Sequence, residues 1–252
     1  MRLKLLKIGF IGVFLLGATF FSFAPKSEAV GVEHRSIIGV DERSRVFDTT
    51  LAPYQSTVYV SSNGYMGSGA VIGKNTVLTA AHVVKRIMEN PTKATNYVIP
   101  GRNGATLPYG KFKIKQVHIP QRYLDKVDLD HDIAVLTLEE NNGHSIGDVV
   151  KQNPMVLTNT VSIGNTISSM GYPGDKPFGT MWESKGKIIR QSTNRIDHDI
   201  DTVGGQSGSP IFNENHEIIA VHVSGGKYNN SSVKLNTEHI EFVLKYIGDT
   251  SN

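Results

Sequence analysis

Short, regularly spaced runs of Val, Ile, Thr and Tyr constrain the fold of this chain more than any other feature. From Ser56 onward, clusters of Gly, Asn and Pro separate these runs. The first residue types suit the pleated surface of a sheet, and the second supply turns. The expected strands are Ser56–Val60, Ala70–Gly73, Thr76–Ala81, Ile114–Ile119, Ile133–Leu138, Ser162–Met170, Lys185–Arg190, Ser209–Phe212, Glu217–Val223 and Ser232–Leu235. The pattern predicts an all-β fold and leaves open whether the strands form a sandwich or a barrel.

Two stretches have helical character. Val83–Met88 follows His82 and is long enough for one or two turns. Near the end of the chain, Asn236 can cap a helix whose apolar residues, from Ile240 to Ile247, fall on one face. We expect this second segment to be a packed terminal helix.

The amino-terminal residues have the pattern of a secretory signal. Met1–Lys7 is basic, Ile8–Phe23 is uncharged and mostly apolar, and small residues occupy the first and third places of Ser27-Glu28-Ala29. This pattern predicts a signal peptide over residues 1–29 that is cleaved after Ala29, and therefore a secreted, extracellular protein. The apolar run is short for a membrane span.

Composition restricts the partners of the mature chain. The sequence has no cysteine, so no disulfide can form, and a chain of this size can bury enough core without one. Without residues 1–35, 21 basic and 21 acidic residues remain. This balance gives no reason to expect binding to nucleic acid or to a membrane surface.

Three local motifs contain residue types suited to nucleophilic catalysis. Ser207 lies in the glycine-rich stretch Thr202–Pro210, His82 ends Thr79-Ala80-Ala81-His82, and Asp132 directly precedes an apolar strand. A serine hydroxyl is a poor nucleophile unless a base such as imidazole takes its proton, and a carboxylate can orient that imidazole. The acid-rich stretch Asp128–Asp132 also offers Asp128 and Asp130; we choose Asp132 because it adjoins the strand.

The three motifs, in the order His, Asp, Ser, resemble those of the trypsin-like serine peptidases. A second match, Gly171–Pro177 with Thr180–Ile188, is similar to the glutamyl endopeptidases of staphylococci, and the similarity extends from about Ser36 to the C-terminus. The resemblance implies two six-stranded antiparallel β-barrels of the chymotrypsin-like kind with a C-terminal helix. It places the first barrel at residues 36–153, the second at 154–252, and a short pro-segment at 30–35.

The same resemblance implies the roles of individual residues. His82, Asp132 and Ser207 would form the catalytic triad, and the N–H groups of Gly205 and Ser207 the oxyanion hole. The side chains of Thr202 and His222, with the free amino group of Ser36, would hold a substrate carboxylate. Substrates would then be proteins or peptides cleaved after Glu, less readily after Asp, by a monomer that needs no metal or cofactor.

Two departures from the glutamyl endopeptidases leave alternatives open. Asp201 stands where the staphylococcal relative has Ser, and in the trypsin branch an acid at this offset selects Lys or Arg. The relative also has Trp directly after the histidine, where this chain has His222-Val223-Ser224. The alternatives are therefore a peptidase with basic specificity, an exfoliative-toxin-like protein of narrow specificity, and an inactive binding module.

Overall fold

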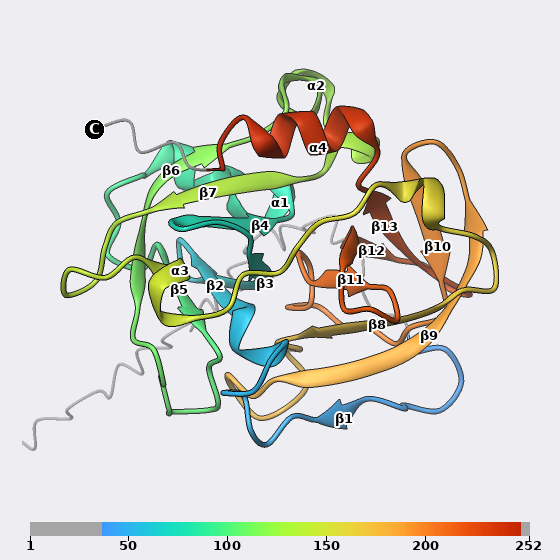
Figure 1. Cartoon of the computed structure of the whole chain (residues 1–252), viewed down its shortest axis with the longest axis horizontal. Coiled ribbons are helices and arrows are strands. Elements are labelled where there is room, and N and C mark those ends of the chain that lie inside the picture. Colours follow the sequence, from blue (N-terminus) through green and yellow to red (C-terminus); the bar gives the residue numbers. More distant parts are fainter. Residues whose placement is uncertain (1–36, 248–252) are drawn as a thin grey trace, which may run out of the picture. The chain divides into compact units, whose positions relative to one another are not determined.

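The strands close into two antiparallel barrels in the computed structural model, which describes residues 37–247 (Figure 1). Around the first barrel the order is β2 (Thr57–Ser62), β3 (Tyr65–Val71), β4 (Thr76–Thr79), β7 (Ala134–Leu138), β6 (Phe112–His118) and β5 (Tyr97–Pro100). Around the second it is β8 (Thr166–Gly171), β9 (Trp182–Gln191), β10 (Arg195–His198), β13 (Asn230–Lys234), β12 (Ile218–Gly225) and β11 (Pro210–Phe212). The expected fold of two six-stranded barrels is confirmed.

Short helices join the strands. The α-helices are α1 (Ala81–Val84), α2 (Gln121–Lys126), α3 (Ile146–Val149) and α4 (Thr237–Leu244). The 3-10 turns are η1 (Tyr54–Ser56), η2 (Lys85–Glu89), η3 (Leu129–His131) and η4 (Thr158–Thr160). α4 begins as expected, because the side chain of Asn236 accepts a hydrogen bond from the N–H of His239 at 2.9 Å.

The two barrels share apolar packing. One buried cluster fills the first barrel and continues through Tyr172, Phe212 and Val221 of the second. Tyr172 has no exposed surface, and its ring meets that of Tyr59 edge to face, with centroids 5.6 Å apart. A smaller cluster around Ile188, Ile196 and Ile211 fills the interior of the second barrel. The seam between the barrels is therefore a packed interface that can hold side chains from both in fixed positions.

Both ends of the described chain cross to the opposite barrel. β1 (Ser44–Arg45) pairs with β9 of the second barrel. α4 carries Val243 into the core cluster of the first barrel, and Tyr246 just after it stacks on His118 of β6, with ring centroids 3.9 Å apart. The proposed division at residue 153 thus leaves one segment at each end that packs against the other barrel.

Several expectations concern residues outside the described range. The signal peptide at 1–29, the pro-segment at 30–35 and the proposed mature residue Ser36 all lie there. Over residues 37–247, no helix is both long and apolar enough to span a bilayer.

Candidate active site

His82 and Asp132 come together because their strands are neighbours in the first barrel. β4 ends at Thr79 and leads into α1, which carries His82, while Asp132 lies just before β7; Thr79 pairs with Ala134. Nδ1 of His82 lies 2.7 Å from Oδ2 of Asp132, and the backbone N–H of His82 donates to Oδ1 at 2.9 Å. Because a carboxylate only accepts hydrogen bonds, Nδ1 carries the proton and Nε2 of the neutral ring is left as the acceptor.

The three neighbouring aspartates make different contacts. Asp132 is 2% exposed, and both of its oxygens contact His82. Asp128 instead accepts from the N–H of Asp130, and Asp130 contacts the side-chain amide of Asn194 at 3.4 Å. Only Asp132 of the three is placed to orient the imidazole.

Ser207 lies in a turn that the first barrel holds in place. The backbone O of Ser207 accepts from the N–H of Ser68 on β3 at 2.8 Å. The hydroxyl of Ser68 donates to the carbonyl of Gly205 at 2.9 Å and accepts from the N–H of Tyr172 at 3.0 Å. The serine turn of the second barrel is thus bonded to a strand next to β4, the strand that leads to His82.

The glycines beside Ser207 permit this close approach. Gly205 and Gly208 have φ values of +99° and +86°, a backbone conformation that other residues adopt at a cost. A Cβ on Gly208 would clash with the carbonyl of Ser68 and would lie 3.1 Å from the N of Ala80, two residues before His82. The turn therefore packs directly against the chain segment that carries His82.

The backbone N–H groups of the turn around Ser207 fall into two pairs: those of Gln206 and Gly208 have acceptors, and those of Gly205 and Ser207 have none within residues 37–247. The N–H groups of Gln206 and Gly208 donate to the carbonyls of Val203 and His222 at 3.0 and 2.8 Å. Those of Gly205 and Ser207 make no such bond within the described chain. Free N–H groups at these two positions are what a developing oxyanion requires.

Thr202 and His222, the two described residues expected to bind a carboxylate, are both buried. Thr202 is 0% exposed and its hydroxyl has no hydrogen-bond partner in the described part of the chain. His222 is 2% exposed, and its ring centroid lies 5.9 Å from that of His198. Burial lowers the pKa of His198 to about 4, so this ring, which contacts the hydroxyl of Ser232 at 2.9 Å, is neutral near pH 7.

The carboxylate of Asp201 holds the segment that precedes β1. Its two carboxylate oxygens accept the N–H groups of Ile38 and Glu42 at 2.7 and 2.9 Å. The side chain is 3% exposed, and the N–H of Asp201 is itself bonded to the hydroxyl of Ser184 at 3.2 Å. A carboxylate engaged in this way is not presented to an incoming Lys or Arg, which argues against the basic alternative.

A buried arginine ties the same amino-terminal segment to the serine turn. The guanidinium of Arg43 has no exposed surface and bonds to Asp41 at 2.8 Å and Asp175 at 2.6 Å. It also reaches Oε1 of Gln206 at 3.4 Å, an oxygen that accepts from the N–H of Val203 at 2.9 Å. Hydrogen bonds from Arg43 hold the pKa of Asp41 well below its usual value, against the opposing effect of burial.

Arg43→Met is therefore expected to lower the free energy of unfolding by about 2–3 kcal/mol, because Asp175 loses its ion-pair partner and Asp41 keeps only Lys176, at 2.8 Å, among the described residues. This loss is smaller than that expected for a fully buried ion pair, because Asp41 and Asp175 are partly exposed. Arg45→Met is the matched control: among the described residues, the side chain of this exposed arginine contacts Asn103 at 3.4 Å and the ring of Phe47, and has no carboxylate partner. Urea unfolding of both variants measures the difference, and equal losses would contradict a bracing role for Arg43.

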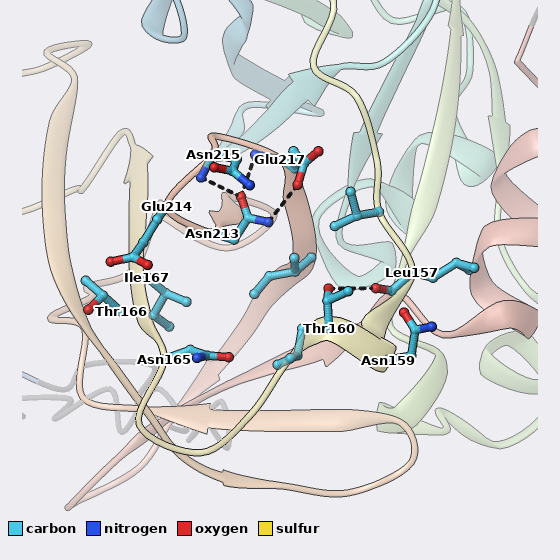
Figure 2. A pocket seen from close by; sticks show the side chains of 13 residues that line it. Leu157, Asn159, Thr160, Asn165, Thr166, Ile167, Asn213, Glu214, Asn215 and Glu217 are labelled. Carbon is cyan, nitrogen blue, oxygen red and sulfur yellow. Dashed lines mark hydrogen bonds between the residues drawn. The ribbon is translucent and has the colours of Figure 1, made fainter.

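A cavity of about 530 Å³ lies elsewhere on the second barrel (Figure 2). It is lined by the segment from Val156 to Val161, the start of β8 and the β11–β12 turn. At its rim, the side-chain amide of Asn213 donates to Glu217 at 2.8 Å. None of the expected site residues lines it.

The two barrels, the oriented His82 and the glycine-flanked Ser207 at their seam are the architecture of a serine peptidase. The family model described as Trypsin matches residues 42–243. The chain is 35% identical over 226 residues to a glutamyl endopeptidase of Bacillus licheniformis, covering 86% of this chain and 70% of the relative. It is 38% identical over 221 residues to one of Staphylococcus epidermidis, covering 84% and 75%.

A solved structure of a Glu endopeptidase superimposes with a TM-score of 0.77 at 29% identity, covering 85% of this chain and 100% of that one. The chain belongs to the trypsin-like serine peptidase family. It is a serine endopeptidase with the chymotrypsin-like fold, and its curated relatives at this level of identity are glutamyl endopeptidases.

Sequence reasoning did not foresee the residues that brace the site. It gave no role to Arg43, Gln206 or His198, and it weighed Asp201 only as a specificity residue. The bonds of Asp201 to Ile38 and of Arg43 to Gln206 each join residues 163 positions apart. The one available signal was the charged pair Asp175-Lys176 in the stretch that resembles the glutamyl endopeptidases.

Proposed function

We propose that this endopeptidase is secreted and cleaves protein and peptide substrates after Glu, less readily after Asp. Ser207 is the nucleophile, His82 the general base and Asp132 the group that orients the base. The observation that carries the proposal is the 2.7 Å contact between His82 Nδ1 and Asp132, made beside a serine turn bonded to the same barrel.

The reaction needs a single proton relay. Oγ of Ser207 attacks the carbonyl carbon of the scissile bond while Nε2 of His82 takes the hydroxyl proton. The imidazolium, stabilised by Asp132, then gives that proton to the leaving amine as the C–N bond breaks. Water, activated by the same imidazole, hydrolyses the acyl-enzyme and restores the Ser207 hydroxyl.

The N–H groups of Gly205 and Ser207 stabilise the charge that develops on the carbonyl oxygen. Their lack of an acceptor among residues 37–247 supports this role. Donors fixed by the backbone need no reorganisation during the reaction, and one such donor raises kcat about 10²–10³-fold.

A substrate Glu is held by the hydroxyl of Thr202, the imidazole of His222 and the amino group of Ser36. The buried hydroxyl of Thr202 has no hydrogen-bond partner among residues 37–247, which supports this site because a buried polar group normally has a partner. Ser36 lies two positions before Ile38, whose N–H is bonded to Asp201. Removal of residues 1–29 as a signal and 30–35 as a pro-segment would free this amine.

The proposal is tested with matched fluorogenic peptides that carry Glu, Gln, Asp, Arg or Lys before the scissile bond. The expected order of kcat/KM is Glu, then Asp, with Gln about 10²-fold or more below Glu, because the neutral amide leaves donors unpaired. A preference for Arg or Lys would support the basic alternative instead. Failure to cleave any of these peptides or casein, in a protein that an organophosphate still labels at Ser207, would favour the narrow-specificity alternative.

A further inference from the structure

One edge of β12 is open beyond the serine turn. β11 pairs with β12 only as far as Val221, and the N–H of His222 then donates to the carbonyl of Ser209 at 2.9 Å. From Ser224 to Gly225, β12 pairs with β13 on one side, and no strand within residues 37–247 pairs with the other. An extended peptide whose scissile bond lies at Ser207 can therefore add to this edge through its residues on the amino-terminal side.

A bulge directs Ser224 away from the barrel interior. The register of β12 against β13 shifts between His222 and Ser224. The ring of His222 faces the buried His198, whereas the hydroxyl of Ser224 contacts the guanidinium of Arg195. Without the bulge, the alternation of a strand would place both side chains on one face. β12 therefore directs the side chain of His222 to one face and that of Ser224 to the other.

Arg195 is fixed at this outer face by contacts with both barrels. Its Nη1 donates to the carbonyl of Leu129 on η3 of the first barrel at 2.8 Å. Its Nη2 donates to the hydroxyls of Ser224 and Ser231 at 3.1 and 2.8 Å, and Nε donates to Ser231 at 3.1 Å. A guanidinium has five N–H donors, so one on Nη1 is left for another acceptor.

The charge of Arg195 has no carboxylate ion pair among the described residues. The carboxylate nearest in its network, that of Asp197, is bonded to Nε of Arg190 at 2.6 Å and reaches Arg195 only through the hydroxyl of Ser231. On the first barrel, Asp130 accepts a hydrogen bond from the side-chain amide of Asn194, the residue before Arg195. A guanidinium that is already immobilised loses little entropy when it binds a carboxylate, so it suits recognition of an acidic side chain.

Given cleavage at Ser207, on which this subsite depends, we infer that Arg195 forms a second acidic subsite with Ser224 and Leu129. It takes a Glu or Asp at the second or fourth residue before the scissile bond. In an extended peptide these side chains point to the face opposite the residue held at His222, whereas the third residue does not. Leu129, which is 55% exposed, supplies an apolar wall for the stem of that side chain.

The test compares peptides that share one cleavable bond and carry Glu or Gln at the second, third or fourth position before it. The shared residue before the bond is the one the protein cleaves best, so the subsite is tested whatever the primary specificity proves to be. In the parent protein, Glu in place of Gln at the second or fourth position is expected to raise kcat/KM about 10-fold, and at the third to change it little. In Arg195→Gln the Glu-to-Gln ratio should fall close to one.

The ratio is taken within each variant, so a partial loss of folded protein does not alter it. Arg190→Gln is the matched control, because this arginine lies on the neighbouring strand β9 and is paired with Asp197; its ratio should equal that of the parent. Fluorescence anisotropy of the same peptides bound to Ser207→Ala gives a readout that needs no turnover. A ratio near one in the parent, or an equal fall in Arg190→Gln, would overturn the subsite and leave the primary specificity untouched.

Discussion

Ser207→Ala is expected to lower kcat for peptide hydrolysis by about 10⁵–10⁶-fold, because the hydroxyl that forms the acyl-enzyme is gone. His82→Ala should lose about as much, and the double variant no more, since nucleophile and base act as one unit. Asp132→Asn should lose about 10⁴-fold, because an amide at this position no longer enforces the Nδ1–H tautomer of His82. Steady-state kinetics on one good substrate gives all four values.

A neighbouring serine provides the control for this series. Ser209 lies two residues further along the same turn, is 0% exposed, and its hydroxyl has no hydrogen-bond partner among residues 37–247. Ser209→Ala should therefore keep the activity of the parent and remain reactive toward an organophosphate, while Ser207→Ala should not be labelled. If Ser209→Ala were the inactive variant, the assignment of the nucleophile would be wrong.

The sequence predicted the barrel strands where apolar and β-branched residues form continuous runs. It missed β1, β5 and β10. β5 ends at Pro100 and is followed by Gly101, a pair typical of a turn. β10 alternates charged and inward-facing residues over four positions, too few for a strand period to stand out. Both become strands because neighbours on each side pair with them. Such pairing is a tertiary effect that local propensity does not contain.

The residues of the site also differ in how far the sequence alone can predict their roles. His82, Asp132 and Ser207 could be proposed because each sits in a recognisable local motif. Asp132, chosen from its place before a strand, is the aspartate that contacts His82. The role of Asp201 could not be predicted, because its partners are the backbone N–H groups of Ile38 and Glu42. Backbone donors have no sequence signature, so the offset of Asp201 from Ser207 suggested a pocket acid where the structure has an anchor.

Two buried groups near Thr202 and His222 supply no positive charge to the proposed glutamate site. His198 lies behind His222, but burial holds its pKa near 4, so it contributes no charge near pH 7. Asp201 is engaged with the amino-terminal segment. The donors proposed to select Glu over Gln are therefore the imidazole of His222 and the amine of Ser36, together with the hydroxyl of Thr202.

His222→Ala is accordingly expected to lower kcat/KM for a Glu substrate by about 10²-fold or more, while the Gln substrate changes far less. Thr202→Val, which removes a neutral donor from a site of the same shape, should cost less, about 10-fold on the Glu substrate. Loss of the substrate carboxylate's partners acts in the ground state and the transition state alike, so most of the effect should be in KM.

His144→Ala is the matched control, because this exposed histidine lies in the hairpin after β7 of the first barrel and should leave both substrates unaffected. The decisive quantity is the Glu-to-Gln ratio, which does not depend on the fraction of active protein. If His222→Ala lowers kcat/KM for both peptides equally, the imidazole supports the fold of the second barrel and does not read the substrate. If the ratio collapses while Gln cleavage persists, the buried histidine on β12 is the group that reads the negative charge.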